Sequence, residues 1–368
     1  VNDLPTGSVS ITGNFTQKET LTVINDLVDE DGIVEVNYQW YRDGEILENE
    51  TGNTYTLKQE DVGSIFTVTA SYNDNKGNPH SVTSEPTIEI SNFNDQPTGL
   101  VTITGVVEED QVLTASNDLD DKDGMGEITY QWNRDGNTIN NANGDTYTLT
   151  QEDVGTVITV TASYTDGFNN PHNVTSAGTI KVVNVNDTPT GSVTITGTAQ
   201  EDQVLIASNT IVDEDVAGEI TYQWNRDGNT IDNANGNTYT LTQEDVGFTI
   251  TVTANYTDGQ GTVESVTSQP TAVVSNVNDP PTGEVTITGT AQEDQELTAS
   301  NTIVDEDGVE VGEITYSWSN GKTGTKITLG QSDVGSTITV TANYTDGQGN
   351  VESVTSQPTA VVSNVNDP

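Results

Sequence analysis

The chain is built from short runs in which apolar and polar residues alternate, and a helical period is almost absent. In the run 158–164, inward-facing Ile, Val, Ala and Tyr alternate with polar residues. Alternation with a period of two is typical of a strand with one buried face. The run 128–132 follows the same pattern and ends at the turn signal Arg134-Asp-Gly136, and similar runs lie at 101–105, 111–115, 146–149 and 179–183. We therefore predict six or seven short strands in this part of the chain, which together form an all-β sandwich.

This pattern occurs four times, and each unit is bounded by the same short segment. The run Asn94–Gly99 returns as Asn186–Gly191 and Asn278–Gly283, with further copies at residues 2–5 and 366–368. The steps between copies are 92, 92, 92 and 88 residues. Proline fixes φ and favours an extended, stiff connection. We predict four domains, at residues 1–93, 94–185, 186–277 and 278–368, within a longer array.

The fourth repeat departs most from the others. The segment from Trp318 to Leu329 is six residues shorter than its counterpart in the third repeat, and the acidic loop 305–312 is two residues longer. Both changes fall in predicted loops, where a sandwich tolerates them.

Two features of each repeat resemble immunoglobulin-like (Ig-like) folds. A tryptophan ends the third predicted strand, and a turn such as Gln151–Gly155 precedes the longest strand. The tyrosine usual after that turn is replaced by Val157, and there is no cysteine for the usual disulfide. The resemblance implies four tandem Ig-like β-sandwich domains, which we expect to form an extended rod. The four tryptophans are Trp40, Trp132, Trp224 and Trp318.

Composition narrows the possible functions. The chain has 57 acidic and 10 basic residues, for a formal net charge of −47. This balance argues against binding to nucleic acid or to anionic membrane surfaces, because both require clustered lysine and arginine. No apolar run is long enough to span a bilayer. The absence of cysteine removes disulfide and zinc–thiolate chemistry. We interpret the charge as a requirement for counter-cations.

The candidate ligands are acidic residues that recur at four places in the repeat. They lie in the loop after the second strand, in the first turn, in the Asp-Gly turn after the longest strand, and in the joint itself. The residues of the first two groups are Asp29, Asp31, Asp121, Asp123, Asp213, Asp215, Asp305 and Asp307, and then Glu109, Asp110, Glu201, Asp202, Glu293 and Asp294. Those of the last two groups are Asp166, Asp258 and Asp346, and then Asp95, Asp187 and Asp279.

Sandwich topology predicts that these groups converge where two domains meet. The first turn and the chain end share one pole of a domain, whereas the chain start and the loop after strand two share the other. Ca²⁺ takes six to eight oxygen ligands with loose geometry, whereas Mg²⁺ demands a tighter octahedron. We therefore predict Ca²⁺ at the joints. Any single cluster fits an ordinary solvated turn equally well, since Asp-Gly and Asn-Asp are common turn residues; the convergence of several favours calcium.

Some polar residues are expected to have other roles. We expect Asp61, Asp153, Asp245 and Asp333 to cap their own turns. His80 and His172 occupy the same position in two repeats and are expected to be solvated loop residues. Repeat one has Gln17-Lys18-Glu19 in its first turn, so the joint between repeats one and two is predicted to bind metal more weakly or with fewer protein ligands.

The Asn-Asp-x-Pro joints, the Asp-x-Asp loops and the run Tyr-Thr-Asp-Gly at 164–167, 256–259 and 344–347 resemble the tandem extender repeats of giant bacterial calcium-dependent (RTX-type) adhesins and bacterial cadherin-like repeats. The resemblance covers the whole chain. It implies secretion from a Gram-negative bacterium through a type I system, attachment at the outer membrane and an extracellular position. The implied role is a spacer that projects a terminal binding domain in attachment or biofilm formation.

We expect a monomeric rod whose partners are neighbouring repeats of the same chain, with no membrane insertion. A module that itself binds a carbohydrate or another surface is the alternative. An enzyme is disfavoured, because acids that recur in every repeat do not define a single active site.

Overall fold

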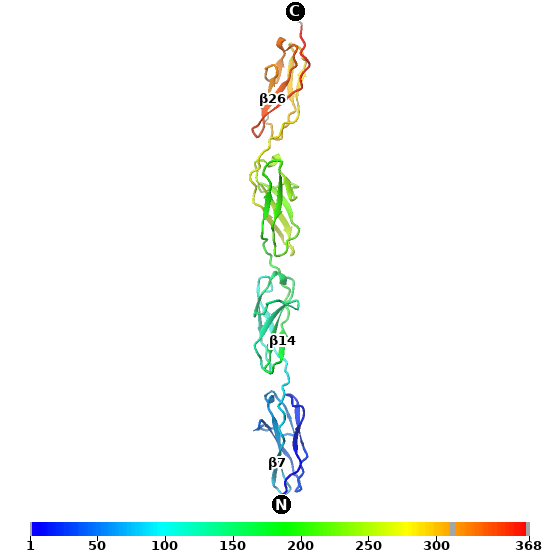
Figure 1. Ribbon diagram of the computed structural model, residues 1–368, viewed down its shortest axis with the longest axis vertical. Coiled ribbons are helices and arrows are strands. Elements are labelled where there is room, and N and C mark those ends of the chain that lie inside the picture. Colours follow the sequence, from blue (N-terminus) through cyan, green and yellow to red (C-terminus); the bar gives the residue numbers. More distant parts are fainter. Residues whose placement is uncertain (1, 310–313, 366–368) are drawn as a thin grey trace. The chain divides into compact units, whose positions relative to one another are not determined.

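The computed structural model describes residues 2–309 and 314–365, and the regular elements in these ranges are strands and single 3₁₀ turns. The longest strand of repeat two, β13 (Ile158–Thr165), buries every second residue, as the alternating sequence predicts. The prediction of an all-β fold is therefore confirmed (Figure 1).

Each repeat folds into two antiparallel sheets. In repeat two the three-stranded sheet has the order β12-β9-β8, and the four-stranded sheet has the order β11-β10-β13-β14. The bounds are β8 Val101–Thr104, β9 Val112–Asn117, β10 Thr129–Arg134, β11 Asn137–Thr138, β12 Thr146–Thr148 and β14 Pro171–Thr175, with the turn η2 at Gln151–Asp153.

Repeats one and three have the same arrangement. The first contains β1 Val9–Thr12, β2 Thr20–Asn25, β3 Asn37–Arg42, β4 Glu45–Ile46, β5 Thr54–Thr56, η1 Gln59–Asp61, β6 Phe66–Asn73 and β7 Pro79–Thr83. The third contains β15 Val193–Thr196, β16 Val204–Asn209, β17 Thr221–Arg226, β18 Asn229–Thr230, β19 Thr238–Thr240, η3 Gln243–Asp245, β20 Ile250–Thr257 and β21 Val263–Thr267.

Repeat four has two three-stranded sheets, β22-β23-β25 and β24-β26-β27. The shortened segment after Trp318 leaves no counterpart of the two-residue strand β18 in the described part of this repeat. The acidic loop 305–312 lies partly, and the final joint 366–368 wholly, outside the described residues. The bounds are β22 Val285–Gly289, β23 Glu296–Asn301, β24 Thr315–Trp318, β25 Lys326–Thr328, η4 Gln331–Asp333, β26 Val340–Thr345 and β27 Val351–Thr355.

A tryptophan lies at the centre of each core, where the Ig-like resemblance places it. Trp132 is fully buried and packs with Leu113, Leu149 and other apolar residues of both sheets. Its indole Nε1 donates to the carbonyl of Gly144 at 3.0 Å. This bond satisfies the one polar group that the ring takes into the core. One such core lies within each of the four repeats, while the domain boundaries stay predictions.

The predicted strand 179–183 is not a continuous strand. It crosses between neighbours, so that Val182 bridges Val154 of the turn and Val183 bridges Glu108 of the first turn. These bridges bring the chain end, the first turn and the 3₁₀ turn to one pole of the domain, as sandwich topology predicts. At the other pole, Asp166 lies beside the loop after strand two, where Gly167 N–H donates to Asp123 O at 3.0 Å.

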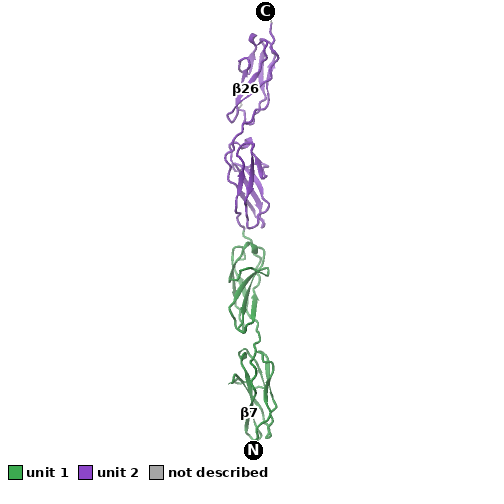
Figure 2. Ribbon diagram, in the orientation of Figure 1, with its two compact units in different colours: residues 1–185 green, residues 186–368 purple. Residues whose placement is uncertain are grey.

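The chain divides into two compact units, residues 1–185 and 186–368 (Figure 2). The first contains repeats one and two with the joint at 94–99, called joint 1 below. The second contains repeats three and four with the joint at 278–283, called joint 3. Joint 2, at 186–191, begins at the boundary between the units. None of the helical segments in the described part of the chain is long or apolar enough to cross a bilayer.

Candidate metal centres at the joints

Three carboxylates from separate segments of the second unit meet at joint 3. Glu201 comes from the first turn of repeat three, Asp279 from the joint, and Asp307 from the acidic loop of repeat four. Each supplies one oxygen that lies within 4.8 Å of the other two. Glu201 and Asp307 are 2% and 4% exposed. Burial of several carboxylates at this spacing is unfavourable unless a cation accompanies them.

Backbone hydrogen bonds hold these side chains in place. Glu201 Oε2 accepts the N–H of Val277, at the end of repeat three, at 3.1 Å. Asp307 Oδ2 accepts the N–H of Asp279 at 2.9 Å, and its own N–H donates to Asp305 Oδ1 at 3.0 Å. The first turn, the joint and the acidic loop are therefore linked before any ion is considered.

Two members of the cluster, Glu201 and Asp279, have a raised pKa. Burial, and then the charges of Asp279 and Asp307, raise the pKa of Glu201, although the Val277 N–H acts in the opposite direction. Burial and the charges of Asp307 and Asp202 raise the pKa of Asp279. A carboxyl whose pKa is raised on folding opposes folding once the pH exceeds its ordinary value. The ion-free cluster is thus least favourable at neutral pH, where a cation relieves the repulsion.

A neutral amide side chain, Gln243, lies beside Glu201 and contacts a second one, Asn276. A polar atom of the Gln243 side-chain amide lies 2.7 and 3.0 Å from the two Glu201 oxygens and 3.1 Å from Asn276 Oδ1. Without an ion, the Gln243 amide nitrogen at this position donates to the Glu201 carboxylate. With a bound cation, the amide oxygen is favoured at the same position, because oxygen can act as a ligand. In repeat two, Oδ1 of Asn184, the counterpart of Asn276, is buried without a hydrogen-bond donor. Carboxylate and amide oxygens are the ligands that Ca²⁺ prefers.

The sequence analysis did not identify this glutamine or this asparagine as candidate ligands. Both residues recur at the same position in every repeat, and this recurrence could have identified them as candidates. The glutamines are Gln59, Gln151, Gln243 and Gln331, and the asparagines are Asn92, Asn184, Asn276 and Asn364.

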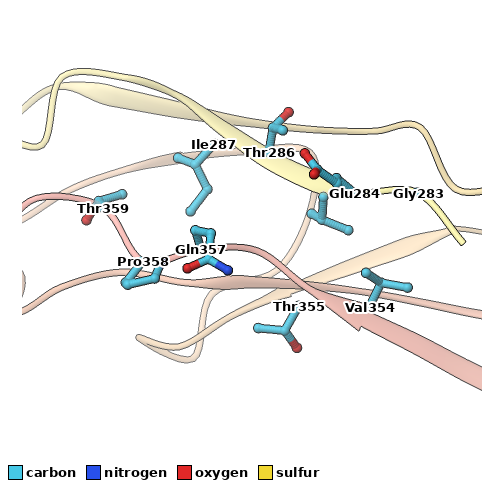
Figure 3. A pocket seen from close by; sticks show the side chains of 10 residues that line it. Gly283, Glu284, Thr286, Ile287, Val354, Thr355, Gln357, Pro358 and Thr359 are labelled. Carbon is cyan, nitrogen blue, oxygen red and sulfur yellow. The ribbon is translucent and has the colours of Figure 1, made fainter.

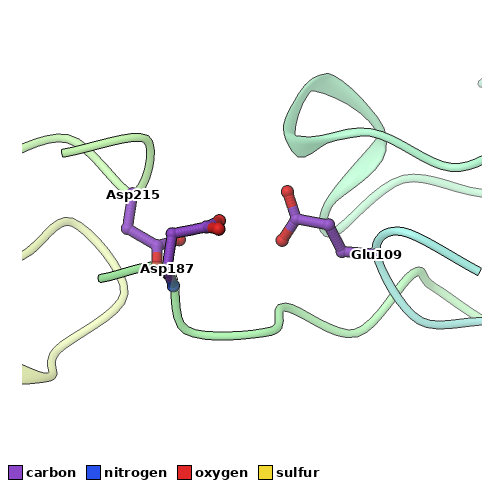
Figure 4. Close-up of side chains that lie close together, drawn as sticks. All are labelled: Glu109, Asp187 and Asp215. Atoms are coloured by element: carbon purple, nitrogen blue, oxygen red, sulfur yellow. Dashed lines mark hydrogen bonds between the residues drawn. The ribbon is translucent and has the colours of Figure 1, made fainter. Parts of the chain in front are cut away.

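Each unit contains residues of joint 2 in the same local arrangement. In the first unit, Glu109 Oε2 accepts the N–H of Val185 at 3.3 Å. In the second unit, the N–H of Asp187 donates to Asp215 Oδ2 at 3.1 Å (Figure 4). Glu293 accepts the N–H of Val365 at 3.2 Å in the same way, and the joint that follows it lies outside the described residues.

Most of the other predicted ligands are hydrogen-bonded within their own repeat. Asp121 accepts the N–H of Asp123 through Oδ1 and the hydroxyl of Tyr164 through Oδ2. Asp29, Asp213 and Asp305 make the same pair of bonds. Oδ1 of Asp166, Asp258 and Asp346 accepts two backbone N–H groups of the turn that follows. Asp110, Asp202 and Asp294 occupy exposed positions with positive φ. These residues shape the loops, and their role as ligands stays a prediction.

The expectation for the turn aspartates is confirmed. Asp153 is fully buried, and its Oδ2 accepts the N–H of Thr150 at 2.9 Å and the Tyr147 hydroxyl at 2.8 Å. Arg134 Nε donates to its Oδ1 at 2.7 Å.

The expectation for the histidines was wrong. The side chains of His80 and His172 are 5% exposed and lie on strands β7 and β14, which the sequence analysis did not assign. His172 stacks on Tyr164 with ring centroids 5.2 Å apart, and its Nε2 lies 3.4 Å from Asp166 Oδ2.

A groove of about 480 Å³ lies in repeat four between β22 and the end of β27 with the segment that follows it (Figure 3). Threonine, glutamine, proline and aliphatic side chains line it, Glu284 is its one charged residue, and no aromatic side chain contributes. This lining offers neither a stacking surface nor the convergent polar groups of a specific ligand site.

No protein-family model matches the chain, and no curated protein matches it either. Solved structures do resemble it. A Ca²⁺-stabilised adhesin that helps an Antarctic bacterium bind ice is 14% identical, with a TM-score of 0.39, over 98% of this chain and all of that one. A tetra-tandem repeat from the extending region of a large adhesion protein is 16% identical, with a TM-score of 0.33, over 96% and 99%. Cadherin domains 3–6 of protocadherin gamma B2 are 12% identical, with a TM-score of 0.31, over 99% and 100%.

Proposed function

We propose that this chain is a calcium-rigidified extender region of a bacterial surface adhesin, a spacer that projects a terminal binding domain for attachment or biofilm formation. The observation that carries the proposal is the group formed by Glu201, Asp279 and Asp307, because its members come from both sides of joint 3. A cation held by all three resists motion of one repeat against the next. The sequence period extends the proposal to Glu109, Asp187 and Asp215.

The residues of the joint perform this role by position and charge. The N–H of Asp279 donates to Asp307, so the joint is attached to repeat four. Glu201 instead accepts from the N–H of Val277, at the end of repeat three. Bound Ca²⁺ supplies the positive charge that both sides share. Extracellular modules bind calcium with dissociation constants of about 10⁻⁴–10⁻³ M. Such sites suit a protein secreted to the cell surface, and the role requires no catalysis.

Small-angle X-ray scattering of the whole chain tests this function. In millimolar calcium we expect a long, narrow distribution of interatomic distances, and in chelator we expect the maximum dimension to fall as the joints bend. Magnesium at the same ionic strength is the control, and it should resemble the chelated sample because Mg²⁺ fits loosely placed ligands poorly. A maximum dimension that is equal with calcium and with chelator contradicts the stiffening role.

A further inference from the structure

Joint 1 differs from joint 3 at positions that decide its charge. At six equivalent positions, joint 3 has six carboxylates, whereas joint 1 has three aspartates, two lysines and one glutamine. The acidic positions of joint 3 are Glu201, Asp202, Asp279, Asp305, Glu306 and Asp307. Their counterparts in joint 1 are Gln17, Lys18, Asp95, Asp121, Lys122 and Asp123. Joint 1 lies wholly within the first unit.

Two local features of the backbone are nevertheless the same in both joints. Gln17 Oε1 accepts the N–H of Phe93 at 3.2 Å, as Glu201 accepts that of Val277. Lys18 has a φ of +72°, close to the +62° of Asp202. Non-glycine residues other than asparagine and aspartate rarely adopt this conformation. Lys18 therefore occupies a position shaped like those of the aspartates in the other repeats.

The Lys18 ammonium reaches the joint aspartate. Its Nζ lies 2.5 Å from Asp95 Oδ1 and 4.2 Å from the centre of the Phe93 ring. Phe93 occupies a position at which the other repeats have valine. The aromatic ring that contacts the Lys18 ammonium is therefore also found at this joint alone among the four equivalent positions. The hydrogen bond from Lys18 is the largest cause of the lowered pKa of Asp95, and the charge of Lys122 acts in the same direction.

The remaining oxygens of joint 1 are bridged by amides. Gln17 Nε2 donates to Asp95 Oδ2 at 3.3 Å and to Gln59 Oε1 at 2.7 Å. Gln59 Nε2 then donates to Asp123 Oδ1 at 3.1 Å. These donors and the ammonium take the places that a cation would need, so the residues of joint 1 do not fit Ca²⁺. Asn92 Oδ1 is buried without a hydrogen-bond donor. Joint 1 therefore keeps one neutral oxygen like those beside joint 3, although it has lost most of the negative charge of joint 3.

We propose that the Lys18 ammonium closes joint 1 in place of a divalent cation, so that repeats one and two are held together without calcium. The contrast with joint 3 rests on the calcium-dependent function proposed above. The array then contains one joint that stays closed when calcium falls and others that loosen.

Distance measurements between spin labels test the two joints separately. The chain has no cysteine, so cysteines introduced at two positions are labelled specifically. Thr12 and Thr104 are exposed equivalents in β1 and β8, on either side of joint 1, and Thr196 and Thr288 are their counterparts across joint 3. We expect the 12/104 distances to be narrowly distributed in both calcium and chelator. The 196/288 distances should be narrow in calcium and broad in chelator.

Substitutions at residue 18 identify the group responsible. Lys18→Met keeps most of the length of the side chain but removes its charge, and it should broaden the 12/104 distances under both conditions, whereas Lys18→Arg should keep them narrow. Gln17→Glu with Lys18→Asp should make this joint depend on calcium.

The outcomes separate the two proposals. A wild-type 12/104 distribution that broadens in chelator, or one that stays narrow in the Lys18→Met variant, overturns the role of Lys18. If the 196/288 distance distribution is the same in calcium and in chelator while the 12/104 distribution depends on Lys18, the calcium function alone is overturned.

Discussion

Replacing Glu201 by glutamine and Asp279 by asparagine is expected to weaken calcium binding at joint 3 by at least about 100-fold, or about 2.8 kcal/mol. Two of the three grouped carboxylates lose their charge in this variant. Two unit charges 4 Å apart interact by about 4 kcal/mol at an effective dielectric constant of 20, so a loss of this size is conservative. Isothermal titration of the whole chain with calcium should show one site fewer.

The same variant should have the opposite effect in chelator. Burial and neighbouring carboxylates raise the pKa of both residues, so their neutral replacements remove repulsion in the ion-free state. We therefore expect higher thermal stability than wild type without calcium and lower stability with it. The control is Asp232→Asn, at an exposed position outside the carboxylate group. Equal calcium affinity in the variant and the control would exclude this group as the site.

Replacing Asp245 by alanine should destabilise repeat three by about 3 kcal/mol, because Asp245 accepts from several donors and leaving a buried donor without its acceptor costs about 1–3 kcal/mol. Asp245 is fully buried and accepts from Arg226 Nε and the Tyr239 hydroxyl, both at 2.8 Å. Burial and this carboxylate raise the pKa of Tyr239 to about 12, so the tyrosine remains a donor at neutral pH. Without Asp245, the Tyr239 hydroxyl and Arg226 Nε lose this acceptor.

Hydrogen exchange resolved by peptide measures this effect in the whole chain. Exchange should accelerate in residues 186–277 and stay unchanged in the matching peptides of repeat two. Glu244→Ala is the matched control, because Glu244 is 80% exposed and pairs with the same arginine at 3.4 Å. Exposed pairs contribute about 0–1 kcal/mol. Similar exchange in the two variants would contradict the structural role of Asp245.

Period-two alternation was enough to predict the cores. It placed Ile158 and Val160 inside, and it placed Trp132 where the two sheets meet, because one buried face leaves a strand a single choice of orientation. The capping role of Asp153 was predictable for another reason, because the hydrogen bonds of a tight turn join residues that are close in sequence.

Contacts that depend on more than one segment were predictable only where sandwich topology brings the segments together. Strand β14 begins at Pro171 and carries His172, and nothing in its own sequence distinguishes it from a loop. The run 179–183 has the composition of a strand, yet its neighbours change along its length, so it forms only single bridges. The convergence of Glu201 with Asp307 was inferred from topology alone. That Lys18 reaches Asp95 depends on a positive φ, which the residue type does not indicate.

Anomalous X-ray scattering from a crystal of the whole chain grown in calcium shows whether joint 3 holds an ion. We predict an anomalous peak at joint 3, 2.3–2.6 Å from oxygens of Glu201, Asp279 and Asp307, as is usual for calcium. Well-ordered carboxylates at joint 3 with no anomalous peak between them would contradict it.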